Sequence, residues 1–224
     1  MLLKSINIVF LIFYLCLPRV VIAQINFPAY KLPKHAITRL GKGSISTSNK
    51  AITISPNGDL IAVATTIGIW LYNAKTYHTI DLLIGHTDSV ESVTFSPNGD
   101  ILASAASYAD ATTVKPGEIK FWLVANQSEI GSLKGHPAMI KSIAFSPNGK
   151  FLPSAGGDYL IPGELKLWSV EDQKEIASLI GHKGIVNAVT FSPDGLLSAS
   201  TDAGNLLTAG ENYGQWKTKM FLPL

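Results

Sequence analysis

A short tetrapeptide recurs along the chain at intervals of 41 to 50 residues, and this repetition constrains the fold more than any other feature. A Gly-His pair precedes each of the last three copies, and the serine of the tetrapeptide always lies ten residues after the histidine. The distance from that serine to the next tryptophan varies from 15 to 26 residues. Fixed spacing beside variable spacing indicates a repeated unit with one loop that tolerates insertions. The copies are Ser55–Gly58, Ser96–Gly99, Ser146–Gly149 and Ser192–Gly195, and the tryptophans are Trp70, Trp122, Trp168 and Trp216.

Each unit divides into short stretches in which apolar and polar residues alternate, and these predict antiparallel strands. The first strand ends in phenylalanine, and Pro-Asn-Gly or Pro-Asp-Gly then makes a turn, because proline presets φ and glycine supplies a positive φ. Four short antiparallel strands per unit are typical of a propeller blade. The predicted strands are Val90–Phe95, Ile101–Ala105, Glu118–Trp122, Ile130–Leu133, Ile140–Phe145, Phe151–Ala155, Glu164–Trp168, Ile176–Leu179, Val186–Phe191 and Leu196–Ser200.

The first 23 residues predict a secretion signal. Lys4 provides a positive start, Ile6–Leu17 is an apolar run, and Val21-Ile22-Ala23 places small residues where a signal peptidase cuts. The apolar run is shorter than the roughly 20 residues that a membrane-spanning helix needs. We therefore expect a secreted or periplasmic (extracytoplasmic) protein without a membrane span after cleavage, or a membrane-anchored protein if the signal is retained.

Composition excludes several classes of function. The 224 residues include 18 Lys and Arg, 16 Asp and Glu, and one cysteine, Cys16. Cleavage after Ala23 would remove Lys4, Arg19 and Cys16, leaving 16 basic and 16 acidic residues. A neutral chain offers no net positive field to a phosphate backbone, so we expect no nucleic-acid partner. A chain without cysteine has no disulfide, no thiol chemistry and no Cys-ligated zinc.

The repeated motifs together resemble the WD40 repeat, from about Ala36 to Trp216, although the aspartate that follows the tryptophan in that family is absent. The stretch from Gly41–Ser44 into Ile67–Tyr72 resembles secreted bacterial WD40 arrays. The resemblance implies an all-β, WD40-type β-propeller with about four recognisable blades, incomplete or completed by dimerisation. The implied organisation is a signal peptide (1–23), an N-terminal extension (24–35) and a propeller (36–224), with blades at roughly 43–82, 83–133, 134–179 and 180–224 and a candidate closing strand at 36–42.

WD40 blades carry a structural tetrad of histidine, serine or threonine, aspartate and tryptophan, joined by hydrogen bonds because buried polar groups need partners. The resemblance therefore implies structural roles for the Gly-His histidines, which a ring would hold too far apart for a shared metal. The first blade has no tetrad. The implied tetrads are His86, Ser104, Asp110 and Trp122; His136, Ser154, Asp158 and Trp168; and His182, Ser198, Asp202 and Trp216.

The loops between second and third strands carry aromatic and apolar residues, and in WD40 proteins they lie on the rim that usually docks partners. We expect a non-catalytic exported scaffold that binds a protein or peptide there, without cofactor or metal. One alternative is a central funnel that binds a small molecule, sugar or metal, or that hydrolyses a substrate, through Glu118, Glu164 and Glu211. A further alternative is a truncated fragment without independent function, and a homodimer is another arrangement to test. The candidate rim residues are Tyr108, Lys115, Tyr159, Leu160, Ile161 and Tyr213.

Overall fold

The computed structural model describes one part of the chain. The chain divides into two compact units, Met1–Ile37 and Thr38–Leu224, and every described residue lies in the second unit. The predicted signal and N-terminal extension lie outside the described residues, as does all of the candidate closing strand except Leu40. No helix in the described ranges is long and apolar enough to cross a membrane. These ranges are 40, 44–45, 50–108, 115–158, 163–179, 182, 184–195 and 197–201, the last of them by its backbone alone.

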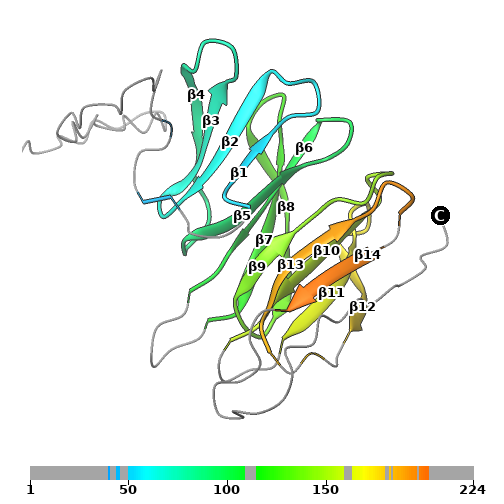
Figure 1. Ribbon diagram of the computed structural model, residues 1–224. Coiled ribbons are helices and arrows are strands. Elements are labelled where there is room, and N and C mark those ends of the chain that lie inside the picture. Colours follow the sequence, from blue (N-terminus) through cyan, green and yellow to red (C-terminus); the bar gives the residue numbers. More distant parts are fainter. Residues whose placement is uncertain are drawn as a thin grey trace, which may run out of the picture. The chain divides into compact units, whose positions relative to one another are not determined.

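The described residues form fourteen strands in four antiparallel sheets and no helix (Figure 1). In each sheet the strands lie side by side in chain order, which is the topology of propeller blades. Within the described ranges the sheets do not close into a ring. The predicted all-β class with WD40-type blades is confirmed. The sheets are β1 (Ile52–Ile54), β2 (Leu60–Thr65), β3 (Gly68–Asn73) and β4 (Thr79–Leu83); β5 (Val90–Phe95), β6 (Ile101–Ala106), β7 (Gly117–Leu123) and β8 (Ser128–His136); β9 (Ile140–Ile143), β10 (Phe151–Gly156), β11 (Glu164–Ser169) and β12 (Lys174–Leu179); and β13 (Val186–Phe191) with β14 (Leu197–Thr201).

The repeated tetrapeptide forms the turn between the first two strands of each blade. In the turn between β5 and β6, Ser96 Oγ donates to Asn98 Oδ1 at 2.7 Å and accepts from the backbone N–H of Ile101 at 2.9 Å. The N–H of Gly99 donates to the carbonyl of Ser96 at 2.9 Å, and Gly99 has φ 80°, which favours glycine. The same three hydrogen bonds recur in the turns that begin at Ser55 and Ser146.

The core lies between successive sheets. Ile69 and Leu71 of β3 belong to one cluster with residues of β5 and β6, and Ile119 and Phe121 of β7 belong to a second cluster with residues of β9 and β10. All four side chains are at most 2% exposed. Burying a large apolar side chain contributes about 1.5–3 kcal/mol, so each blade depends on its neighbour for stability.

Buried serines join the first strands of neighbouring blades. Ser92 Oγ of β5 accepts a hydrogen bond from the N–H of Ile143 at 3.3 Å, and Ser142 Oγ of β9 accepts one from the N–H of Val189 at 3.1 Å. Both serines are at most 1% exposed. These hydrogen bonds connect β5 to β9 and β9 to β13, which belong to different sheets and are not paired with each other as strands.

Two strands end two or three residues away from the predicted end. The strand predicted over Ile130–Leu133 extends from Ser128 to His136, and its ladder with β7 continues across two shifts of register. The strand predicted over Ile140–Phe145 ends at Ile143. The next pairing position on β10 is Pro153, which has no N–H to donate, so the ladder stops there although Ala144 still donates to the Pro153 carbonyl.

Candidate functional site

Two successive blades each contain a buried trio of histidine, serine and tryptophan. In the blade of β5–β8, Ser104 Oγ lies 2.7 Å from His86 Nε2 and accepts from Trp122 Nε1 at 2.8 Å. Ser104 is fully buried and Trp122 is 3% exposed, so each polar group needs the partner that it finds. The equivalent residues of the next blade are His136, Ser154 and Trp168, with distances of 2.5 and 2.7 Å.

A glycine precedes each of these histidines, and the structure gives a reason for each. A Cβ added to Gly85 would come within 3.1 Å of the Trp122 ring, and also within 3.1 Å of Glu129 Oε2. A Cβ on Gly135 would come within 3.5 Å of the Trp168 ring, and the φ of Gly135 is 141°, in the range that disfavours other residues. Close packing therefore explains the glycine at Gly85, and backbone conformation explains the glycine at Gly135.

A glutamate faces the second ring nitrogen of each histidine. Glu118 Oε2 lies 3.4 Å from His86 Nδ1, and Glu164 Oε2 lies 3.6 Å from His136 Nδ1. A carboxylate at this position favours the tautomer with the proton on Nδ1, so that Nε2 accepts from the serine hydroxyl. The signal for the glutamates was their recurrence after Pro-Gly, which had suggested a funnel instead.

The same glutamates lie beside a buried lysine. Lys166 Nζ lies 2.8 Å from Glu175 Oε2 and 3.1 Å from Glu164 Oε1, while Lys120 Nζ lies 2.7 Å from Glu129 Oε1 and 3.9 Å from Glu118 Oε2. Desolvation lowers the pKa of Lys166, but hydrogen bonds to Glu175 and Glu164 outweigh it and raise the pKa overall. Two of the three glutamates that the funnel alternative needs are thus engaged within their own blades, and the third, Glu211, lies outside the described residues.

Burial keeps the histidines neutral. Desolvation, together with a smaller effect of the nearby ammonium of Lys120 or Lys166, lowers the pKa of both His86 and His136 to about 3. Desolvation also lowers the pKa of His182, which is 8% exposed. At physiological pH the imidazoles of His86 and His136 are therefore neutral, and each lies beside a buried serine hydroxyl. In the described part of the chain no three His, Cys, Asp or Glu side chains are grouped to hold a metal ion.

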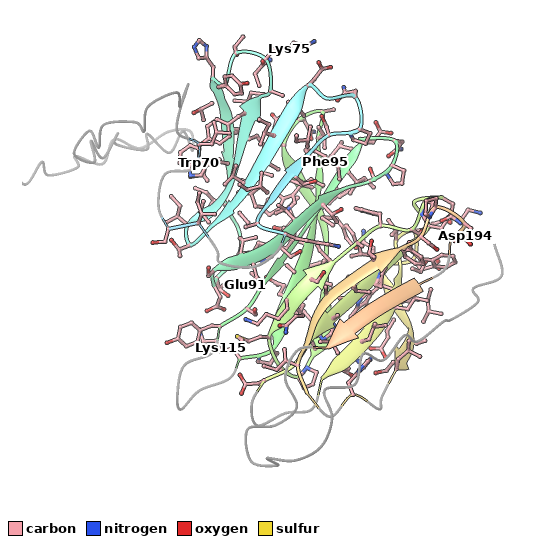
Figure 2. All side chains as sticks on the ribbon, viewed as in Figure 1. Trp70, Lys75, Glu91, Phe95, Lys115 and Asp194 are labelled. Atoms are coloured by element: carbon pink, nitrogen blue, oxygen red, sulfur yellow. The ribbon has the colours of Figure 1, made fainter. Side chains whose placement is uncertain are left out.

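The rim of the blade of β5–β8 carries an ordered group of three side chains. Lys115 Nζ forms an ion pair with Asp88 Oδ1 at 2.8 Å and lies 5.0 Å from the centre of the Tyr108 ring. The backbone N–H of Lys115 donates to the Tyr108 carbonyl at 3.0 Å, which closes the base of the loop. The bond from Lys115 lowers the pKa of Asp88 and the bond to Asp88 raises the pKa of Lys115. Figure 2 shows Lys115 projecting from this end of the blade.

A model of the WD40 family (WD domain, G-beta repeat) matches residues 75–114, 127–169 and 173–211, which is more than half of the chain. The chain belongs to the WD40 repeat family. No curated protein matches the sequence. WD40 domains are in general non-enzymatic scaffolds that bind protein partners.

Several residues that the WD40 resemblance singles out stay predictions. Asp158 is described and is 9% exposed, and Ser198 is described by its backbone, which pairs with Thr190. The remaining residues lie outside the described ranges: Asp110, Asp202 and Trp216 of the implied tetrads, and Tyr159, Leu160, Ile161 and Tyr213 of the candidate rim.

Proposed function

We propose that this WD40 chain is an exported, non-catalytic scaffold that binds a protein or peptide partner through its rim. The rim consists of the loops between second and third strands and the turns that precede first strands. The observation that carries the proposal is the ordered group of Tyr108, Lys115 and Asp88, which joins one such loop to one such turn. Tyr108 is 40% exposed, and tyrosine is among the residues that anchor protein interfaces.

The chemistry of the blades supports a non-catalytic role. Serine, histidine, glutamate and lysine are common catalytic groups, but in two blades they contact one another in partly buried chains of hydrogen bonds and ion pairs. The Trp122 and Trp168 rings complete these chains. A catalytic group must reach its substrate, and these side chains lie within the packed sheets. The exposed polar and aromatic groups at the rim suit recognition better than catalysis.

Replacing Tyr108 and Lys115 together by alanine should weaken partner binding at least thirtyfold, the size typical of a lost interface anchor. The partner would first be identified by cross-linking and mass spectrometry in the source organism, and its affinity then measured by calorimetry. Tyr77→Asn is the matched control, since Tyr77 is 37% exposed at the other end of a blade and asparagine tolerates its φ of 58°. Equal binding by both variants would contradict docking at this rim.

Export should be visible in the mass of the protein. The form recovered outside the cytoplasm should begin at Gln24, because a signal peptidase would cut after Ala23. Intact-mass spectrometry measures this directly. The variant Leu11→Arg, which places a charge in the apolar run, should remain uncleaved inside the cell. Finding only the full-length form of the unchanged protein, confined to the cytoplasm, would refute the proposal of export.

A further inference from the structure

A hollow of about 330 Å³ lies where the first strands of three blades end. The hollow is at the opposite ends of these strands from the rim, because the Ser-Pro turns and the rim loops alternate along the chain. Figure 2 labels Phe95 at the end of β5 and Asp194 in the turn that follows β13. Serine, threonine and lysine side chains also line the hollow, so its wall is partly polar, and each of the three blades gives it a phenylalanine and a proline: Phe95, Phe145, Phe191, Pro97, Pro147 and Pro193.

One cation, Lys50, lines this hollow. Its Nζ donates to the carbonyl of Ile143 at 3.0 Å and to the carbonyl of Val189 at 2.7 Å. These carbonyls belong to β9 and β13, which fix the ammonium between two blades. An ammonium has three N–H donors, so these two bonds leave one donor for a ligand.

The charge of Lys50 has no partner of opposite sign in the described part of the chain. None of the ion pairs there includes Lys50, and desolvation alone lowers its pKa, to about 8. A nearby carboxylate would have raised the pKa instead. At neutral pH the hollow therefore presents an uncompensated positive charge beside aromatic side chains.

A lysine occupies the repeat position of Lys50 in two of the four copies, but only Lys50 lines the hollow. Counted back five residues from the serine of each Ser-Pro turn, the four copies have Lys50, Glu91, Lys141 and Asn187. Lys141 has the same residue type at the same repeat position, but Lys50 lines the hollow and Lys141 does not. Lys141 is therefore a matched control for any effect of removing a lysine from a first strand.

We propose that the hollow binds a small monocarboxylate with an apolar or aromatic body, with the carboxylate on Lys50 Nζ and the body among the three phenylalanines. Its volume is within the range of small-molecule sites, in which polar groups orient the ligand and apolar side chains hold its body. The positive charge of the Lys50 ammonium favours an anionic ligand. Because this is one charge with one remaining N–H donor, it matches a ligand that carries a single negative charge. The proposal is independent of partner docking at the rim.

The first test uses the unmodified full chain. Calorimetric titration at neutral pH should show binding of phenylacetate at least about tenfold tighter than binding of its uncharged amide, phenylacetamide, because only the former can pair with the ammonium. Raising the pH from about 7 to about 9 should weaken phenylacetate binding about tenfold, as Lys50 loses its proton. Absence of binding at millimolar phenylacetate, or equal affinity for acid and amide, would overturn the proposal.

Substitution gives the second test. Lys50→Met removes the charge and keeps an unbranched side chain, and it should abolish the preference for phenylacetate over phenylacetamide. Lys141→Met should retain that preference. Circular dichroism and thermal unfolding of both variants report whether the fold is intact, and the titrations of the unmodified chain decide the question if Lys50→Met fails to fold. A preference that persists in folded Lys50→Met would refute the role of Lys50.

Discussion

Lowering the pH from about 7 to about 4.5 should remove about 5 kcal/mol from the free energy of unfolding, because two buried histidines must take up protons when the chain unfolds. Desolvation lowers the pKa of His86 and of His136 from 6.5 to about 3. Below pH 6.5 the unfolded chain therefore binds more protons than the folded chain. The contribution of the two neutral histidines to the free energy of unfolding is fully present above pH 6.5 and is lost as the pH falls towards 3.

The charged groups around both histidines belong to three strands and a turn. Glu118 and Lys120 of β7 and Asp88 of the turn between β4 and β5 lie near His86. Glu164 and Lys166 of β11 face His136, and Glu175 of β12 also acts on it. Burial is the largest cause of the lowered pKa in both cases, with the lysines acting in the same direction and Asp88 or Glu175 against it.

Urea unfolding at a series of pH values, followed by tryptophan fluorescence, measures this loss. Between about pH 6 and 4 the free energy of unfolding should fall by about 2.7 kcal/mol per pH unit, the value for two protons. The double variant His86→Gln/His136→Gln should have a much smaller slope, and the exposed His78 replaced by glutamine should leave the slope unchanged. A stability that does not vary between pH 7 and 5 would contradict the prediction.

Ser154→Ala should cost about 3 kcal/mol of stability, which is a large share of the 5–15 kcal/mol typical of a folded domain. The hydroxyl of Ser154 serves both His136 Nε2 and Trp168 Nε1, and its removal leaves two buried polar groups without a partner. Each such group costs about 1–3 kcal/mol. Urea unfolding at neutral pH gives the difference directly.

The control for Ser154→Ala is the exposed Ser132 of β8, where the same substitution should change stability by less than about 0.5 kcal/mol. Ser104→Ala should resemble Ser154→Ala, since Ser104 makes the same two bonds in the preceding blade. Equal small losses at Ser154 and Ser132 would show that the shared hydroxyl does not stabilise the blade.

Most strands could be predicted because their signals are local. The turn at Ser96 is specified by four neighbouring residues, and the alternation of Val90–Phe95 marks a strand whatever its surroundings. The early end of β9 also has a signal in the sequence, which is Pro153 on the strand that pairs with it. The length of β8 has none, since it depends on irregular pairing with β7.

The side-chain network was harder to predict because it depends on register and on distant segments. The sequence indicates histidine, serine and tryptophan by their spacing, but which carboxylate faces His86 follows from how β7 lies in the sheet. Lys50 reaches carbonyls 93 and 139 residues further along the chain. No pattern within one repeat announces such a contact, and only the folded arrangement of several blades creates it.

The order of strands within each sheet has a consequence for synthesis. Every ladder joins strands that are neighbours along the chain, as in β5, β6, β7 and β8. Each sheet can therefore close a few short loops as soon as its own residues leave the ribosome, without waiting for distant sequence. A newly made blade would expose one apolar face until the next is complete, so folding should advance in steps of one repeat, from the N-terminal side to the C-terminal side.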